Sequence, residues 1–440
     1  MHLRGRGPAP RDRLVIAGVV TGEAGRRQPR GQRPGPVRTI GPELISGGSD
    51  NDPTNVGTAA VVGAQSMYRL SWAALLTGPL LYVVLLIAAQ VGVAARSDLQ
   101  SLARKRYGRR VSALLLVSVA GVNVVTIAAD LQAGAAGIGM LARVDSRWLV
   151  LPLGVAVAGL LVTGRYGLVV TVLRYLLPGF LAFTVAAVLA RPDWPRLAES
   201  SLIPALSLHH HELSGALALT GTTLTSYVYI WETVQRGVEE PGARSDGERL
   251  AGARFGALAA AVFTPVILWS MLAASAATLG RHHQLVSPAQ DAAGALRPLA
   301  GTLAGDIFAA GLVISAVVAL PVVISSTAYV AAAHFGWCHG LSQPVARARR
   351  FYAVLVATVG LAVAVAMAGV PVLGALVAAS VIGGLGTPFG LVILVRLARD
   401  REVMNGRPIS LRLAVAGWVV TVVTGGLGVL FLLGTALGMV

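Results

Sequence analysis

Residues 41–55 read GPELISGGSDNDPTN, and this stretch decides the fold. It interrupts an apolar run near 41–66 with glycines, aspartates, asparagines and a proline. Because proline removes a backbone donor, a helix tends to end beside it, and we predict one helix that is unwound near its middle. The alternative is a simple kink in a packed helix. A kink does not require the side chains of Asp52 and Asn55, whereas a binding site does.

The composition places this stretch in a membrane protein. The chain has 440 residues, of which 55% are hydrophobic and 13% charged, with a mean hydropathy of +0.70. A soluble domain is about one quarter charged, so a soluble enzyme and a disordered chain are both excluded. The single cysteine excludes a disulfide framework or a thiolate metal cluster within one chain. Eleven runs of the length that spans a membrane lie near 41–66, 70–95, 111–142, 148–163, 167–190, 213–235, 251–279, 302–335, 351–369, 371–395 and 411–438.

The basic residues set the expected orientation. Residues 1–38 hold nine arginines and no long apolar run, so we expect a disordered basic cytoplasmic arm before a transmembrane domain of residues 39–440. With the N-terminus inside, 29 of the 36 Lys and Arg face the cytoplasm, as the positive-inside rule requires, and eleven spans place the C-terminus outside. The net charge of +16 follows from this topology and from lipid contact, so we expect no nucleic-acid binding. Thirty-five arginines against one lysine indicate GC-rich coding and hence a bacterial inner membrane.

A second interruption lies in the sixth apolar run, where residues 221–232 read GTTLTSYVYIWE. Runs one and six are five apart, which predicts two inverted repeats of five helices, at about 39–190 and 213–395, followed by an eleventh helix. We therefore expect an all-α polytopic membrane protein. Secondary transporters of this design form their substrate site where the two discontinuous helices meet near the bilayer midplane.

Asp52 and Asn55 carry the chemistry of the first break. A carboxylate in the membrane interior is rare and usually functional, although capping of the restarted helix is an alternative role. One carboxylate with an amide, carbonyls and water suits Mg²⁺ or Mn²⁺. A sodium-coupled symporter for an organic solute is compatible with the same residues. The sequence shows no phosphate-binding loop, nucleophile–histidine set or paired carboxylates, so we expect neither an enzyme nor a cofactor.

With these features in view, the chain resembles the NRAMP family of divalent-metal transporters over about residues 39–435. The first break, followed by Gly63-Ala64-Gln65, is similar to the family's first helix with its Asp-Pro-Gly-Asn signature, except that Thr54 replaces the glycine. The resemblance implies a LeuT-like fold with eleven helices. Further similar segments are Asp98-Leu99 to Arg106-Tyr107, Phe308-Ala309-Ala310-Gly311-Leu312, Phe335-Gly336-Trp337, Pro388-Phe389 and Met404-Asn405-Gly406.

The positions at which the chain departs from the family pattern are those expected to set metal selectivity and proton coupling. In its sixth helix the family carries Met-Pro-His, where this chain has Thr225, Ser226 and Tyr227. The loss of methionine removes a soft sulfur ligand that favours transition metals over magnesium. The chain also has Thr222 at the family's carbonyl-donating alanine, Glu232 at its second histidine, Ile127 and Asp130 at its Asp-x-x-Glu pair, and Ser380 at a glutamine of helix ten. This pattern resembles the NRAMP-related magnesium transporters.

The resemblance implies a metal site of Asp52, Asn55, Thr222, Thr225 and Tyr227, with Asp130 and Glu232 as pathway acids. We expect import of Mg²⁺, and also of Mn²⁺, by alternating access without tight proton coupling, in a protein that is expected to be monomeric. The expected partners are the divalent ion and the lipid bilayer. The alternatives are a proton-coupled Mn²⁺/Fe²⁺ symporter, a sodium-coupled organic-solute symporter of the same fold, and a receptor or degenerate member that transports nothing.

Overall fold

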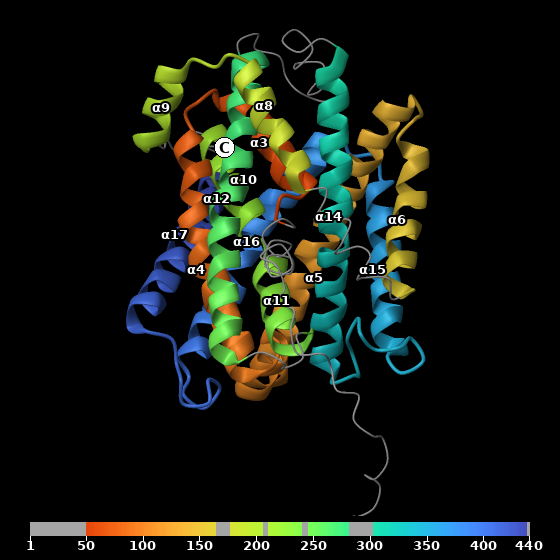
Figure 1. The fold of residues 1–440 in the computed structure, drawn as a ribbon, viewed down its shortest axis with the longest axis vertical. Coiled ribbons are helices and arrows are strands. Elements are labelled where there is room, and N and C mark those ends of the chain that lie inside the picture. The colour runs from red at the N-terminus through yellow and green to blue at the C-terminus, as the bar shows by residue number, and fades with distance from the viewer. Residues whose placement is uncertain (1–49, 164–176, 206–209, 240–244, 281–301, 438–440) are drawn as a thin grey trace, which may run out of the picture. The chain divides into compact units, whose positions relative to one another are not determined.

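The computed structural model describes residues 50–163, 177–205, 210–239, 245–280 and 302–437, and within these ranges all regular structure is helical (Figure 1). The basic arm, the first half of the first predicted helix and most of the fifth run lie outside the described residues. The described elements are α3 (Pro53–Ser66), α4 (Ser71–Ala95), α5 (Leu99–Ala142), α6 (Arg147–Val162), η1 (Leu177–Phe180), α8 (Leu181–Leu189), α9 (Trp194–Leu202), α10 (His210–Thr223), α11 (Ser226–Val234), η2 (Gln235–Glu239), α12 (Asp246–Thr278), α14 (Thr302–Phe335), α15 (Arg349–Ala366), α16 (Val372–Arg399) and α17 (Leu411–Ala436).

The sixth predicted helix is broken, as expected. Helix α10 ends at Thr223 and α11 begins at Ser226, so only Leu224 and Thr225 separate the two halves. The break lies a few residues beyond Gly221, because Thr225 has extended backbone torsions and acts as the N-cap of α11. The first helix shows the matching feature: residues 50–52 are not helical, and α3 begins at Pro53.

One connection between predicted spans is itself helical. The basic segment between the predicted spans near 70–95 and 111–142 was not predicted as a helix, yet α5 begins at Leu99. This element runs to Ala142 and consists of two helical segments that meet at a kink, where Gly108 has non-helical torsions. Asp98 starts this helix because its side chain accepts a hydrogen bond from the backbone N–H of Ser101 at 2.8 Å. Gly108 makes the kink at φ 83°, a backbone conformation that glycine adopts without strain.

The two broken helices lie at the centre of the helical domain. Every residue of α11 is buried, as are twelve of the fourteen residues of α3. Helix α3 packs against α10, α12, α16 and α5, while α11 packs against α4, α14, α5 and α16. The polar residues at both breaks are therefore enclosed by protein, which is the condition under which unwound backbone is tolerated at membrane depth.

Glycines allow the close approach of the helices around the breaks. A Cβ on Gly221 of α10 would lie 2.3 Å from the carbonyl oxygen of Ser380, and one on Gly63 of α3 would lie 2.3 Å from that of Leu272. Both distances are far below van der Waals contact. Any larger residue would push α10 away from α16, or α3 away from α12, and would open the packing around the centre.

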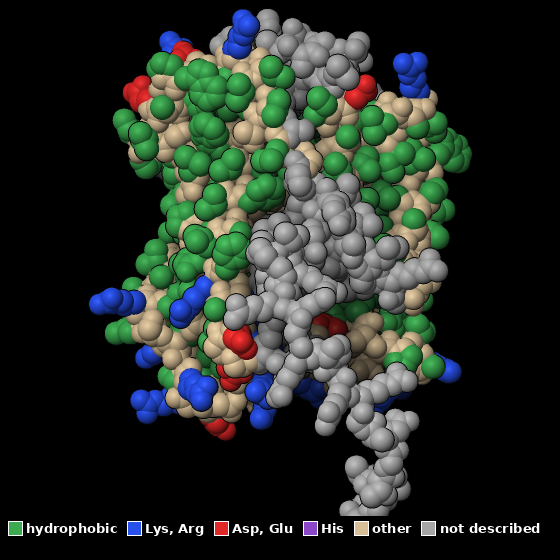
Figure 2. All heavy atoms as spheres, viewed as in Figure 1, with side chains coloured by type: hydrophobic (Ala, Val, Ile, Leu, Met, Phe, Trp, Pro, Cys, Tyr) green, Lys and Arg blue, Asp and Glu red, His purple; other side chains and the backbone are tan. Residues whose placement is uncertain are grey.

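The outer surface has the character of a lipid-facing one. Seven of the described helices are long and apolar enough to cross a membrane. Helix α17 exposes Val419, Val422 and Leu432, which a water-soluble protein would bury. Figure 2 shows hydrophobic side chains over the middle of the visible face and Lys and Arg side chains near its two ends, most of them at the lower end.

Candidate functional site

The carboxylate of Asp52 connects the two broken helices. Asp52 is the N-cap of α3, and its Oδ1 accepts a hydrogen bond from the backbone N–H of Asn55 at 2.6 Å. Its Oδ2 accepts a hydrogen bond from the hydroxyl of Tyr227, in the first turn of α11, at 3.1 Å. Asp52 and Tyr227 are both buried. The predicted site residues Asp52, Asn55 and Tyr227 therefore lie together, although 175 positions separate Asp52 from Tyr227 in the sequence.

Asn55 contributes an amide oxygen to the same place. Its Nδ2 donates to the carbonyl oxygen of Asp50 at 2.9 Å, which fixes the side-chain amide across the break. Its Oδ1 is buried and accepts no hydrogen bond from the described residues. An enclosed amide oxygen without a donor is costly, and a cation would supply the missing interaction.

On the second broken helix, Thr222 and Thr225 engage each other. The hydroxyl of Thr225 donates to the carbonyl oxygen of Thr222 at 2.6 Å and closes the last turn of α10. This bond uses the proton of Thr225 and one lone pair of the carbonyl, so both oxygens keep lone pairs for a further partner. The Thr222 hydroxyl is buried and has no hydrogen-bond partner among the described residues.

Asp130 lies beside the first break, held by a residue that the sequence analysis did not assign to the site. The hydroxyl of Thr54 donates to Oδ1 of Asp130 at 2.6 Å, and the backbone N–H of Thr54 donates to the same oxygen at 3.2 Å. Oδ2 of Asp130 is buried and has no hydrogen-bond partner within the described ranges. Thr54 occupies the position of the family's glycine, so the departure itself was the signal that could have found this contact.

Glu232 does not join this group. Its carboxylate accepts a hydrogen bond from Nε of Arg236 at 2.9 Å, and both side chains are buried, at 4% and 2% exposure. This predicted pathway acid is therefore paired with an arginine within α11 and η2. Ser380, at the family's glutamine position, lies 2.7 Å from the hydroxyl of Thr58 and connects α16 to α3.

Comparison with known proteins places this arrangement in a family. The model of the natural resistance-associated macrophage protein-like family, Nramp, matches residues 44–434. This chain belongs to the NRAMP family. A divalent metal cation transporter of Deinococcus radiodurans is 26% identical over 389 residues, covering 87% of each chain. The NRAMP resemblance of the sequence is thereby confirmed, and the chain is a membrane transporter and not an enzyme.

Solved structures confirm the fold of this NRAMP chain. The manganese transporter of Eremococcus coleocola superposes with a TM-score of 0.68 at 18% identity, covering 90% of this chain and 85% of that one. Mhp1, a nucleobase-cation-symport-1 family transporter, superposes with a TM-score of 0.58 at 17% identity, covering 90% and 91%. The prediction of an all-α, LeuT-like fold is confirmed, and the sixth predicted helix is unwound between α10 and α11.

The five predicted site residues carry only oxygen donors. Asp52, Asn55, Thr222, Thr225 and Tyr227 present a carboxylate, an amide, a backbone carbonyl and hydroxyls. The described residues contain no group of three or more His, Cys, Asp or Glu side chains that could enclose a metal by themselves. Such a donor set suits a hard cation that keeps part of its water shell, and it offers no sulfur or imidazole for a softer one.

Proposed function

We propose that this NRAMP protein transports divalent metal ions, with Mg²⁺ preferred and Mn²⁺ accepted, by alternating access across a bacterial inner membrane. The observation that carries the proposal is the oxygen-only donor set at the two helix breaks, with Thr225 at the place of the family's methionine. The relatives named as a divalent metal cation transporter and a manganese transporter support the class of substrate.

In this proposal Asp52 and Asn55 bind the ion directly. Asp52 supplies the one carboxylate that is held between both broken helices. The Asn55 Oδ1 and the Thr222 carbonyl supply neutral oxygens, while Thr225 and Tyr227 contact the ion or one of its waters. A single full negative charge with neutral donors leaves room for retained water, which Mg²⁺ gives up reluctantly.

The surroundings of the two candidate pathway acids support transport without tight proton coupling. Glu232 is paired with Arg236, and Asp130 accepts two hydrogen bonds from Thr54. Each of these carboxylates is thus engaged by a neighbouring residue of the protein. The membrane potential alone favours entry of a divalent ion by about 4–5 kcal/mol per 100 mV, since each charge contributes about 2.3 kcal/mol.

The direction of transport rests on the proposed orientation, with the N-terminus inside and the C-terminus outside. In this orientation the long connections that carry most arginines face the cytoplasm, where the anionic leaflet attracts them. The lower end in Figure 2, where blue side chains are most frequent, is then the cytoplasmic end.

The test is metal influx into proteoliposomes, with Mg²⁺ and Mn²⁺ supplied separately and the internal pH recorded. We expect both ions to enter without acidification and without a sodium requirement. Asp52→Asn keeps the shape of the side chain and removes its charge, so it should abolish both fluxes. Asp193→Asn, at the half-buried N-cap of the outer helix α9, is the matched control and should leave them intact.

Each alternative function gives a different result in this assay. Entry of Mn²⁺ with protons and exclusion of Mg²⁺ would indicate the proton-coupled symporter and would overturn the magnesium proposal. Flux of an organic solute that depends on sodium would indicate the symporter of the same fold. Metal binding without any flux would indicate a receptor.

A further inference from the structure

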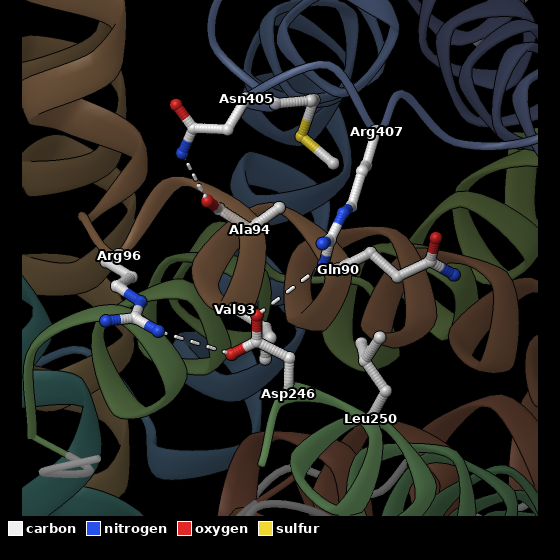
Figure 3. Close-up of a pocket in the computed structure, with 9 residues that line it drawn as sticks. Gln90, Val93, Ala94, Arg96, Asp246, Leu250, Asn405 and Arg407 are labelled. Carbon is white, nitrogen blue, oxygen red and sulfur yellow. Dashed lines mark hydrogen bonds and ion pairs between the residues drawn. The ribbon is translucent and has the colours of Figure 1, made fainter.

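A cavity lies apart from the broken helices, at the end of the molecule that the arginine distribution assigns to the cytoplasm. It has a volume of about 330 Å³ and lies between the end of α4, the start of α12 and the loop between α16 and α17 (Figure 3). None of the proposed metal-binding residues lines it. Its lining residues are Gln90, Val93, Ala94, Arg96, Asp246, Leu250, Met404, Asn405 and Arg407.

The charge around this cavity is positive. One carboxylate, that of Asp246, faces the guanidinium groups of Arg96 at 3.5 Å and Arg407 at 3.8 Å (Figure 3). These three charged residues of the cavity lining carry a net charge of +1. Both distances are longer than a good charge-assisted hydrogen bond. The side chains of Arg96 and Arg407 are 71% and 81% exposed, so their donors remain accessible at the rim.

The acidic residues of the loop between α16 and α17 pair with an arginine outside the cavity. Asp400 accepts a hydrogen bond from Nε of Arg106 at 2.6 Å, and Glu402 lies 3.7 Å from the same guanidinium. Neither residue lines the cavity. The positive charge at Arg96 and Arg407 is therefore not cancelled from this side, and an anion would find two guanidinium groups on opposite walls.

Part of the cavity lining is apolar, and its shape is fixed. Val93, Leu250 and Met404 line the cavity from three different elements, and Val93 and Met404 are buried. Nδ2 of Asn405 donates to the carbonyl oxygen of Ala94 at 2.8 Å, which holds the loop on the end of α4 (Figure 3). Exposed guanidinium groups together with apolar lining residues fit an amphiphile with an anionic head better than a small inorganic anion.

We propose that this cavity binds an anionic phospholipid of the cytoplasmic leaflet, with the headgroup phosphate between Arg96 and Arg407 and part of an acyl chain along Val93, Leu250 and Met404. Arginine forms paired hydrogen bonds with phosphate oxygens, and basic cavities between membrane helices at the cytoplasmic side select anionic headgroups. Asp246 is the resident counter-ion, which keeps the two guanidinium groups aimed at the cavity when no lipid is bound. The choice of leaflet rests on the proposed orientation, while the site itself does not depend on the transported ion.

Native mass spectrometry of the full-length protein in detergent tests the site. Phosphatidylglycerol is titrated as the anionic lipid, phosphatidylcholine as the lipid without net charge, and inorganic phosphate as the soluble anion. We expect the unaltered protein to retain one phosphatidylglycerol in preference to phosphatidylcholine. Arg96→Gln and Arg407→Gln should each weaken that binding roughly fivefold, the effect of one basic residue near an anionic lipid. Arg401→Gln, which removes an exposed arginine of the same loop outside the cavity, should have no effect.

The variant Asp246→Asn distinguishes two roles for these residues: a lipid-binding site, or a set of ion pairs that only holds the helices together. If phosphate replaces Asp246 as the partner of the arginines, Asp246→Asn should tighten lipid binding, whereas Arg407→Gln weakens it. Equal lipid retention in all variants would overturn the proposal, and so would equal loss in Arg401→Gln. Displacement of the lipid by millimolar inorganic phosphate would also overturn it, because the site would then belong to a soluble anion.

Discussion

The hydroxyl of Tyr227 donates to Oδ2 of Asp52 at 3.1 Å, so the one carboxylate of the proposed metal site is shared between the two broken helices. A divalent ion that binds Oδ2 competes with this hydrogen bond. In the proposed site Tyr227 therefore holds the Asp52 carboxyl group while no ion is bound, and the ion replaces this contact. The contact also forms only when α3 and α11 lie close together. Under the alternating-access proposal, the distance between these two helices changes during transport.

Tyr227→Phe should tighten metal binding and lower the thermal stability of the metal-free protein. Removal of a hydrogen bond to a charged group costs about 1.5 kcal/mol, and the metal-free state bears that cost, so the Kd for Mg²⁺ should fall about tenfold. Isothermal titration calorimetry measures the Kd, and thermal unfolding without metal should show a lower Tm. Tyr229→Phe is the matched control, because its hydroxyl reaches only the carbonyl of Thr387, at 3.4 Å. A higher Kd in Tyr227→Phe would instead show that the contact of the phenol oxygen with the ion or its water outweighs the hydrogen bond that Tyr227 makes to Asp52 in the metal-free state.

Thr54→Val should destabilise the protein through Asp130. The substitution keeps the shape of the side chain and removes the donor that lies 2.6 Å from Oδ1 of Asp130. A buried carboxylate that loses a partner costs about 1–3 kcal/mol, so the Tm in detergent should fall by a few degrees. Thr54→Ser retains the hydroxyl and should restore most of the loss. If Thr54→Ser is as unstable as Thr54→Val, the methyl group and not the hydroxyl is the stabilising part.

The sequence predicted the helices and the break at α10 and α11 well, because both depend on local composition. An apolar run of about 20 residues, or an interruption such as GTTLTS, can be recognised in the sequence without knowing which helices pack against it. The helical segment around Arg104 was missed for the same reason. Its charge excluded it from the apolar runs, while the Asp98 cap and the packing of the residues behind it make a helix.

The site was predictable only in part, because its contacts join distant positions. Asp52 and Asn55 could be identified because they are polar residues within an apolar run. The departure from the family's glycine marks Thr54, but it does not identify the partner Asp130, which lies 76 residues away. Glu232 was assigned to the pathway from its position in the family pattern, and its partner Arg236 could have been suspected from the i,i+4 spacing alone.

The ion pair of Glu232 and Arg236 gives a test of the proposed pathway. Glu232→Gln leaves Arg236 buried without its carboxylate, which should destabilise the protein by about 3–5 kcal/mol. The double substitution Glu232→Leu with Arg236→Met replaces the pair by apolar groups of similar volume and should recover most of that stability. Metal flux through the double variant should remain near that of the unaltered protein if the pair is structural. A folded double variant with little flux would show that Glu232 serves the ion pathway after all.

Asp400 provides a pH dependence with a defined sign. Burial by itself raises the pKa of this carboxyl group, but hydrogen bonds from the N–H groups of Val403 and Glu402, and then from Arg106, lower it below its ordinary value of 3.8. A lowered pKa in the folded protein stabilises it above the ordinary pKa, and this contribution is lost as the pH falls through the lowered value. The Arg106 side chain is 48% exposed, so its share should be under about 1 kcal/mol.

The corresponding variant is Arg106→Gln. Its Tm should lie slightly below that of the unaltered protein at pH 7, and the difference should shrink once the pH is below 3.8. Arg401→Gln, a neighbour of the same charge, should show no such difference at either pH. A gap between the unaltered protein and Arg106→Gln that persists at pH 3 would assign the effect to packing of the arginine stem and not to the charge on Asp400.

The substitution Thr225→Met tests the selectivity argument most directly. It places a soft thioether sulfur at the break of the second broken helix, where the family carries its methionine, and removes the hydroxyl that donates to the Thr222 carbonyl. Sulfur favours manganese over magnesium, so the ratio of Mn²⁺ to Mg²⁺ influx should rise about tenfold, the effect of roughly 1.4 kcal/mol in relative binding. Thr225→Leu has a similar size without sulfur and should lower both fluxes without changing their ratio. If both variants shift the ratio equally, the hydroxyl of Thr225 and the space around it set the preference, and the missing sulfur does not.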